Sequence, residues 1–197
     1  MKVILASGSA RRYEILKKHG IDPVVIPSGA EETLSPEIET GSVAEIVKYL
    51  ASIKAQSVYE KLKLQAGKEI SADEKVLILG ADTIVYKDCI IGKPKDEQDA
   101  FAILSLLRNT SHIVFTGISL IDFATGEEIQ FADETEVWFK DYPDEEIYRF
   151  ISEEPPYDKS GSYAIQSSWA KNVDHILGDI ENVIGLPWHR LAEYLVS

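Results

Sequence analysis

Near its N-terminus the chain reads Val3-Ile4-Leu5-Ala6-Ser7-Gly8-Ser9-Ala10-Arg11-Arg12, an apolar run followed by small residues and two arginines. This pattern predicts a buried strand over residues 2–6, a short turn, and a helix over residues 11–19. Small residues let the backbone approach a ligand closely, and the unpaired N–H groups at a helix N-terminus attract anions. Two guanidinium groups add fork-shaped hydrogen bonds. The stretch therefore predicts an anion site where a strand meets a helix.

Further along the chain, apolar runs and helical periodicity alternate. We expect strands at residues 24–26, 76–79, 84–86, 89–91, 112–121 and 128–139. We expect helices at residues 42–64, 96–107, 144–152 and 187–196. Residues 84–86 and 89–91 are predicted to form a hairpin. Strands and helices alternate first and strands dominate the middle, which predicts an α/β fold with a mixed sheet.

Turn and cap residues mark the ends of these elements. The strand at 76–79 is expected to end at Gly80-Ala81-Asp82-Thr83, and residues 30–40 and 67–75 read as loops. Ser42 with Glu45 fits a capping box, and Asp144 fits a helix cap. Because no linker-like segment or repeat interrupts the chain, we expect a single domain over residues 1–197, with room for two lobes around a cleft.

Composition limits the classes of partner. The chain has 197 residues and a formal net charge of −13. This charge disfavours nucleic acid and anionic membranes, so a nucleotide would need a local group of cations, together with a divalent metal. Cys89 is the only cysteine, which excludes an intrachain disulfide, and no segment approaches the ~20 apolar residues of a membrane span. We therefore expect a cytoplasmic protein without membrane or nucleic-acid partners.

Two acidic residues are candidates for chemistry. Asp82 follows the apolar end of a predicted core strand, where ligands gather in α/β sheets, but an aspartate that caps a turn fits the same position. Glu32 lies in a predicted loop, where a solvated acid is the simpler reading. Together with the basic residues, the two carboxylates predict a metal–phosphate site, because Mg²⁺ binds carboxylates, substrate oxygens and water.

Two lysines are candidates for phosphate binding. Lys93 is held between Gly92 and Pro94, and Lys54 lies among apolar residues of the long predicted helix. For Lys54, a side chain that merely extends along the helix to solvent is an equal alternative. Cys89 is expected to be buried in its strand, and the histidines, which lack the spacing of metal ligands, to be structural or at the surface. The chain has no Gly-x-Gly-x-x-Gly, Walker or zinc motif.

These motifs, taken in order, resemble the Maf family of nucleoside triphosphate pyrophosphatases over essentially the whole chain. The matching segments are Ser7–Arg12, Glu32, Lys54, Gly80–Thr83, Lys93–Pro94, Thr116–Gly117, Asp158–Gln166 and Asn182–Pro187. Two positions depart from the family pattern. Ala10 replaces a proline that would preset the first helical turn, and Ser167-Ser168-Trp169 replaces a glycine-rich stretch.

The resemblance implies an inosine triphosphate pyrophosphatase-like fold with a central cleft, and Mg²⁺-dependent hydrolysis of a nucleoside triphosphate to its monophosphate and pyrophosphate. Mn²⁺ or Co²⁺ could replace Mg²⁺. The resemblance is also compatible with a homodimer. It assigns Asp82 as proton acceptor and, with Glu32, as metal ligand. It makes Lys54 and Lys93 catalytic residues together with Asp82 and Glu32, and it makes Ser7, Ser9, Arg11 and Arg12 substrate-binding residues. The two arginines and two lysines would hold the phosphates.

The chain is similar to the family branch that hydrolyses dTTP and UTP, which makes Thr83 and Gln166 candidates for base selection. Two other functions remain open from sequence. One is a nucleotide-binding regulator of cell division and septum formation without essential catalysis. The other is a phosphatase that releases inorganic phosphate.

Overall fold

The computed structural model of the chain describes residues 1–65 and 75–196. The surface connection expected over residues 67–75 lies outside these ranges, apart from residue 75. Seven strands of the described chain form one sheet in the order β2-β1-β3-β5-β6-β7, with β4 paired to β3 as well. The strands are β1 (Lys2–Leu5), β2 (Val24–Val25), β3 (Val76–Lys87), β4 (Cys89–Ile91), β5 (Ser111–Asp122), β6 (Glu128–Phe139) and β7 (Val173–Leu177). β1 runs parallel to β2 and β3, and the other pairs are antiparallel.

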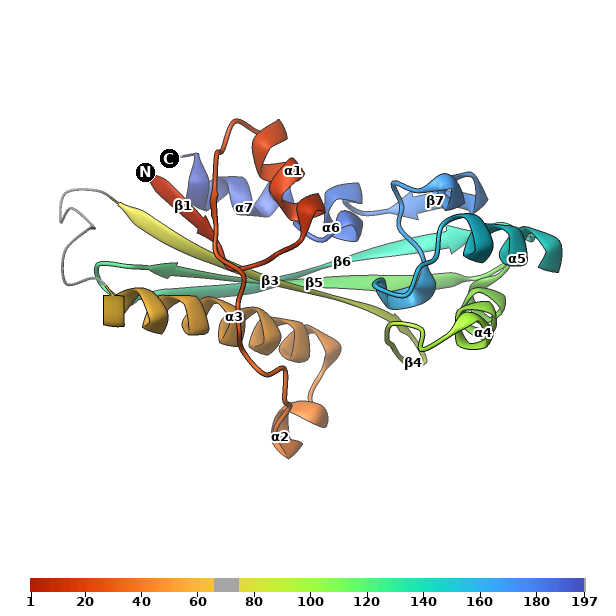
Figure 1. The fold of residues 1–197 in the computed structure, drawn as a ribbon, viewed down its shortest axis with the longest axis horizontal. Helices are drawn as coiled ribbons and strands as arrows, with labels where there is room; N and C mark the ends of the chain where they lie inside the picture. The colour runs from red at the N-terminus through yellow and green to blue at the C-terminus, as the bar shows by residue number, and fades with distance from the viewer. Residues whose placement is uncertain (66–74, 197) are drawn as a thin grey trace.

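Helices cover both faces of this sheet. They are α1 (Ala10–Lys18), α2 (Pro36–Glu39), α3 (Val43–Gln65), α4 (Glu97–Leu107), α5 (Asp144–Glu153), α6 (Ile180–Ile184) and α7 (Trp188–Leu195), with 3₁₀ turns η1 (Ser160–Ser162) and η2 (Ser168–Asn172). The long helix α3 crosses one face, and α1, α6 and α7 lie on the other (Figure 1). None of the helices in the described ranges is long and apolar enough to cross a membrane. The expected mixed-sheet α/β fold is confirmed.

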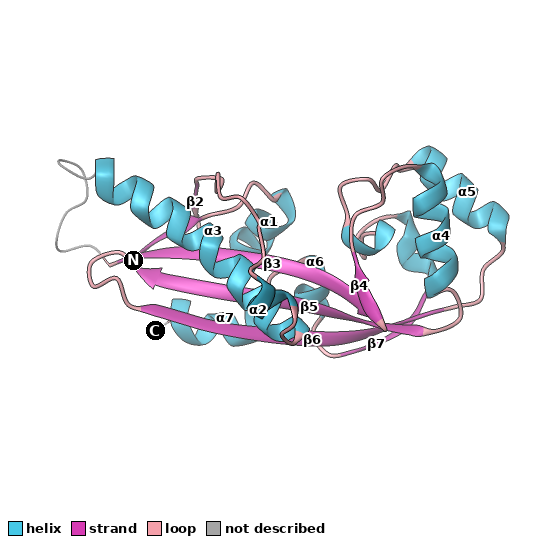
Figure 2. Cartoon of the chain, turned by 90° about the horizontal axis from the view of Figure 1, so that it is seen from below, coloured by secondary structure: helices cyan, strands magenta, loops and turns pink. Residues whose placement is uncertain are grey.

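The three long strands β3, β5 and β6 run through two lobes (Figure 2). The first lobe contains β1, β2, α1, α2, α3 and α7, and its core includes Leu5, Leu16, Leu79 and Leu191. The second contains β4, α4, α5, η1, η2 and β7, and its core includes Leu104, Leu107, Ile147 and Trp169. Since each lobe buries its own apolar cluster against the shared strands, the sheet joins the two lobes.

β3 is longer than expected, because the strand does not end at Gly80. Residues 80–83 continue the antiparallel ladder with β5, where Gly80 pairs with Ser119 and Asp82 with Gly117. A Cβ at Gly80 would lie 2.2 Å from the carbonyl oxygen of Ala51, and one at Gly117 would lie 2.2 Å from that of Val47. These glycines therefore let the backbone of α3 pack directly on the sheet. Gly80, which we predicted to begin a turn, lies within β3, where its lack of a side chain makes room for α3.

One edge of β3 changes partner along its length. β1 pairs with residues 76–79 and β4 with residues 85–87. In the described part of the chain, no strand pairs with residues 80–84 on this edge. A short free edge is therefore left between the two lobes, next to the turn that follows β1.

Several other predictions are confirmed. The other predicted helices and strands of the first 139 residues are present with shifts of one or two residues, whereas the segments predicted as two strands over 76–79 and 84–86 belong to the single strand β3. The Ser42 hydroxyl and N–H both contact Oε2 of Glu45, at 2.9 and 2.7 Å, and the N–H of Glu45 donates to Ser42 Oγ at 3.3 Å, as in a capping box. Of the histidines, His112 is buried in β5 and the others lie at or near the surface, which agrees with the sequence reading.

Some local predictions are wrong. Residues 30–40 contain the short helix α2, and Asp144 is the first residue of α5 instead of its cap, which is Pro143. Cys89 is exposed, because the three-residue strand β4 pairs only with β3 and lies at an edge. β7, α6 and both 3₁₀ turns were not predicted, since they are too short to show a clear periodicity.

Candidate active site

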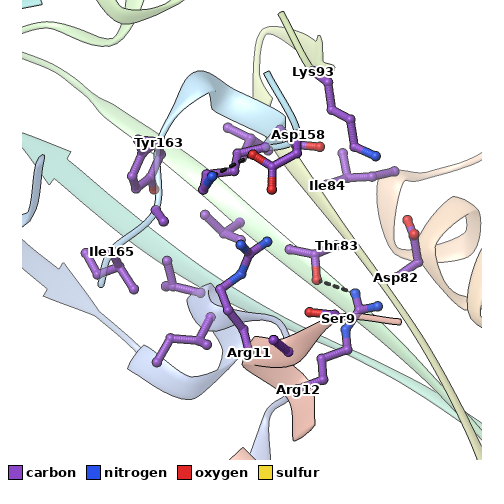
Figure 3. A pocket seen from close by; sticks show the side chains of 18 of the residues that line it. Ser9, Arg11, Arg12, Asp82, Thr83, Ile84, Lys93, Asp158, Tyr163 and Ile165 are labelled. Carbon is purple, nitrogen blue, oxygen red and sulfur yellow. Dashed lines mark hydrogen bonds and ion pairs between the residues drawn. The ribbon is translucent and has the colours of Figure 1, made fainter. Parts of the chain in front are cut away.

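A cavity of about 540 Å³ lies at the free edge of β3, between the two lobes. This volume is within the usual range of small-molecule sites. All the predicted site residues except Ser7 line it: Ser9, Arg11, Arg12, Glu32, Lys54, Asp82, Thr83, Lys93 and Gln166. They come from the β1–α1 turn, the first turn of α1, the loop before α2, α3, β3, the segment after β4 and the segment before η2. Figure 3 shows the labelled members around one space.

Asp82 and Thr83 reach the cavity from opposite faces of β3. Successive side chains alternate across a strand, so Asp82 points to the face covered by α3 and Thr83 to the face covered by α1 and α6. Both line the cavity because the strand edge between them has no partner strand. Asp82 therefore lies in the middle of β3, where we had expected the end of a strand, and the alternative of a turn cap is wrong.

A lysine links the two candidate carboxylates. The ammonium of Lys54 lies 2.5 Å from Oδ1 of Asp82 and 2.9 Å from Oε1 of Glu32. The side chains of Lys54 and Asp82 are each 13% exposed, whereas that of Glu32 is 54% exposed. Lys54 thus does not extend along the helix to solvent. It lies where two carboxylates from a loop and a strand converge.

This convergence fits a divalent cation. Glu32 and Asp82 supply hard oxygen donors, and both approach the same positively charged atom. Mg²⁺ and Mn²⁺ bind such oxygens and complete their shells with substrate oxygens and water. Glu32 and Asp82 are therefore the residues that would hold a metal ion in this cavity.

Arg12 is held in place by three hydrogen bonds to the protein. Its Nε donates to the carbonyl oxygen of Gly185 at 2.9 Å, Nη1 donates to Ser7 Oγ at 3.0 Å, and Nη2 donates to Thr83 Oγ1 at 3.2 Å. Burial lowers the pKa of Arg12 from its ordinary value, and the nearby charge of Asp82 raises it. Ser7, although outside the cavity lining, thus supports a lining residue.

Arg11 and Lys93 are placed differently. Both line the cavity, and their side chains extend into the space between the lobes (Figure 3). Within residues 1–65 and 75–196, neither side chain forms a hydrogen bond or an ion pair with protein. Their charges are therefore available to a ligand, while Arg12 forms part of the fixed wall.

The second lobe forms one wall of the cavity, and of the residues in this wall between 158 and 166 the sequence predicted a site role only for Gln166. Asp158 and Lys159 form an ion pair of 2.6 Å beside the cavity, and the Lys159 hydrogen bond is the main reason that the pKa of Asp158 is lowered. Tyr163 is buried with its hydroxyl 2.7 Å from Nε2 of His112, and burial raises its pKa. Gln166 is exposed at the rim. The Asp158–Gln166 motif was the available signal for Asp158, Lys159 and Tyr163.

Comparison with known proteins finds relatives that are similar to this chain over almost its whole length. The chain is 40% identical over 196 residues to the dTTP/UTP pyrophosphatase of Thermoanaerobacter sp. (strain X514), which covers 99% of this chain and 95% of that protein. It is 41% identical over 199 residues to the dTTP/UTP pyrophosphatase of Agathobacter rectalis, which covers 98% and 96%.

Among solved structures, a nucleoside-triphosphatase / dITP/XTP pyrophosphatase from Mycobacterium abscessus is 15% identical, with a TM-score of 0.41 over 73% of this chain and 76% of that one. A family model described as "Maf-like protein" matches residues 2–197. With a match of this length and relatives at about 40% identity over the whole chain, the chain belongs to the Maf family.

Proposed function

We propose that the protein is a metal-dependent pyrophosphatase that hydrolyses dTTP and UTP to the monophosphate and pyrophosphate, and so clears such nucleotides and modified pyrimidine nucleotides from the pool. One observation carries the proposal. Four cations, Arg11, Arg12, Lys54 and Lys93, share one cavity with the carboxylates Glu32 and Asp82. The names of the relatives support it.

The local charge suits a triphosphate in an acidic protein. The formal net charge of −13 repels anions at long range, so a bound triphosphate needs nearby cations. Arg11 and Lys93 are free to follow the phosphates, while Arg12 and the N-terminus of α1 offer a fixed set of N–H donors. Positioning and charge neutralisation supply most of the catalysis of phosphoryl transfer.

In the proposed reaction, Asp82 accepts a proton from the water that attacks the α-phosphorus. The oxygen of this water forms a bond to phosphorus as the bond between the α-phosphorus and the oxygen bridging to the β-phosphorus breaks. The electron pair leaves with pyrophosphate, whose added negative charge is neutralised by the lysines and arginines of the cavity. Glu32 and Asp82 would hold Mg²⁺, with Mn²⁺ or Co²⁺ as substitutes, and the ion would supply further neutralisation of phosphate charge.

Base selection is assigned to the part of the cavity near the second lobe. The amide of Gln166 can both donate and accept, which matches the alternating groups on a thymine or uracil edge. The hydroxyl of Thr83 contacts Arg12 and Thr116, so it can offer a lone pair to a base. After Gln166, Ser167 caps η2, whose first residues are Ser168 and the buried Trp169.

The proposed setting follows from the same reading. We propose a cytoplasmic enzyme of nucleotide metabolism that acts as a homodimer, with its nucleotide substrate as its partner and without nucleic-acid or membrane partners. The acidic net charge supports the absence of nucleic-acid and anionic-membrane partners, because it repels polyanions.

The test is a nucleotide panel with separate detection of pyrophosphate and phosphate. The purified protein with Mg²⁺ should release pyrophosphate from dTTP and UTP, and omission of the metal should abolish the release. Release of phosphate alone would make the protein a phosphatase. No turnover of dTTP or UTP would exclude the proposed substrates.

Asp82→Asn separates catalysis from regulation. It should abolish hydrolysis while nucleotide affinity changes less than about tenfold, or ~1.4 kcal/mol. Asp141→Asn, an exposed carboxylate outside the cavity, is the control and should keep full activity. If an effect on cell division persists in Asp82→Asn, the alternative of a nucleotide-binding regulator of septum formation gains.

A further inference from the structure

A chain of hydroxyl groups leads from the cavity into the protein interior. Nη2 of Arg12 lies 3.2 Å from Thr83 Oγ1, and Thr83 Oγ1 lies 3.0 Å from Thr116 Oγ1. The Thr116 hydroxyl in turn donates to the carbonyl oxygen of Asn182 at 2.9 Å. Thr116 and Asn182 are both 0% exposed, and neither lines the cavity. These hydrogen bonds thus connect Arg12, which is predicted to bind phosphate, to buried residues that a nucleotide cannot contact.

The donor and acceptor of each hydrogen bond between Arg12, Thr83, Thr116 and Asn182 can be assigned. A hydroxyl carries one hydrogen, and that of Thr116 is donated to a carbonyl, which can only accept. The hydrogen between the two threonines must therefore come from Thr83. Since the Thr83 hydrogen is committed to Thr116, Thr83 accepts from Arg12. All donors along the chain point away from the cavity.

The inner end of the chain is anchored in the sheet. Nδ2 of Asn182 donates to the carbonyl oxygen of Val114 at 2.9 Å and to Thr135 Oγ1 at 3.0 Å, which fixes α6 to β5 and β6. α6 is followed by Gly185, whose carbonyl oxygen accepts from Nε of Arg12 at 2.9 Å. α6 therefore holds Arg12 twice, directly through Gly185 and indirectly through the two threonines.

We propose that Thr116 and Asn182 are positioning residues, which act through Thr83 to orient the guanidinium of Arg12 toward the substrate phosphates. The proposal rests on the proposed function, in that Arg12 binds phosphate. Of the five N–H groups of Arg12, three are held by Gly185, Ser7 and Thr83. One on each terminal nitrogen is left for an anion. Loss of the threonine hydroxyls would weaken one of these three contacts and let Nη2 move, while the bonds to Gly185 and Ser7 remain.

The test compares Thr116→Val, which removes the hydroxyl at nearly constant shape, with Thr116→Ser, which keeps it. We expect Thr116→Val to weaken the binding of inorganic pyrophosphate about tenfold and to lower kcat/KM for dTTP by a similar factor. Thr116→Ser should stay within about threefold of wild type. Ser119→Ala removes another buried hydroxyl of β5, one bonded to Glu128, and is the control that should leave pyrophosphate binding unchanged.

A double-mutant cycle shows whether the effect passes through Arg12. If it does, Thr116→Val should have no further effect on pyrophosphate binding once Arg12→Met is present. Additive effects, or equal losses in Thr116→Ser and Thr116→Val, would overturn the proposal. If Thr116→Val does not fold, the same cycle is made with Thr83→Val and Thr83→Ser at the partly exposed end of the chain.

The two proposals can fail separately. Pyrophosphate binding reports on the orientation of Arg12 even if no nucleotide is hydrolysed. Conversely, normal release of pyrophosphate by the wild-type enzyme together with an additive cycle would leave the proposed function standing and overturn only the positioning role.

Discussion

His112 is a buried imidazole whose protonation opposes folding. It is 2% exposed, and burial lowers its pKa from about 6.5 to about 3. The folded state therefore favours the neutral ring, whereas the unfolded chain takes up a proton near pH 6.5. The stability that this group contributes is complete above pH 6.5 and is lost as the pH falls toward 3. We expect a loss of about 2 kcal/mol between pH 6.5 and pH 5 from this residue.

Urea unfolding at several pH values measures this effect. His112→Gln should be less stable than wild type at pH 7, because it breaks the contact with Tyr163, but its stability should fall less steeply below pH 6.5. His175→Gln, which changes an exposed histidine, should keep the wild-type slope. Equal slopes in wild type and His112→Gln would show that His112 is not the group responsible.

Lys54 competes with a divalent cation for the same two carboxylates. Its ammonium lies within 2.9 Å of both Glu32 and Asp82. We expect Lys54→Met to bind Mn²⁺ about tenfold more tightly than wild type when no nucleotide is present, since a positive charge has been removed from beside the carboxylates. The same variant should lose about 100-fold in turnover, because a cation that neutralises the phosphates is missing.

Mn²⁺ titration followed by electron paramagnetic resonance gives the affinity directly. Lys61→Met, an exposed lysine on the same helix, is the matched control and should leave Mn²⁺ affinity unchanged. Weaker Mn²⁺ binding in Lys54→Met would mean that Lys54 supports the metal site instead of competing for it.

Most charged residues of the site could be predicted from sequence because they stand in short motifs, whereas Lys54 was assigned only through the family resemblance. Arg11, Arg12, Lys54, Asp82 and Lys93 all line the cavity. The sequence could not show that Arg12 is fixed while Arg11 is free. That difference depends on Gly185, 173 positions away along the chain. Nor could it distinguish Thr116 from any other strand threonine, since its role follows from neighbours brought together by folding.

At the scale of elements, the position of α3 depends on two glycines of the sheet. A Cβ at Gly80 would lie 2.2 Å from the carbonyl oxygen of Ala51 and 2.9 Å from the backbone nitrogen of Ala55, so α3 itself would have to move. We expect Gly80→Ala to lower the free energy of unfolding by about 3 kcal/mol, as overpacking of a core does. Activity should also fall, because α3 carries Lys54.

Urea unfolding with Gly29→Ala as control tests this expectation. Gly29 is exposed, and a Cβ there would have no neighbour within 4 Å, so its substitution should change stability by less than about 0.5 kcal/mol. A Gly80→Ala protein as stable as Gly29→Ala would show that α3 does not pack on the sheet as described.

Elements with strong periodicity or clear caps were predictable, and short ones were not. α3 could be predicted from the capping box of Ser42 and Glu45 and from the helical spacing of its apolar residues. By contrast, the glycine at position 80 resembles a turn in sequence, because its packing against α3 is a contact between elements 25 or more positions apart. β7 has five residues and becomes a strand only because β6 is available to pair with it.

At the scale of the whole molecule, the cavity depends on both lobes. The first lobe supplies Arg11, Arg12, Glu32 and Lys54, and the second supplies Lys93 and the segment from Asp158 to Gln166. β3, β5 and β6 pass through both lobes without a break in pairing between β3 and β5 from residue 77 to residue 86. A continuous sheet thus supports the site. A substitution that destabilises one lobe should therefore also lower the stability of the other.

This continuity predicts that the protein unfolds as one cooperative unit, which also tests the expectation of a single domain. Leu104 is fully buried in the core of the second lobe, and Leu104→Ala should cost about 3 kcal/mol. Because β3, β5 and β6 belong to both cores, we expect this loss to appear equally in the first lobe, far from the substitution.

Hydrogen exchange in increasing urea, read by mass spectrometry, can follow peptides from α5 in the second lobe and from β1 in the first. In Leu104→Ala, the most protected amides of both peptides should lose the same free energy of opening and share one dependence on urea. Leu106→Ala, which removes an exposed side chain from the same helix, should leave both peptides unchanged. If only the α5 peptide responded to Leu104→Ala, the second lobe would unfold by itself, and the shared strands would join two domains instead of forming one.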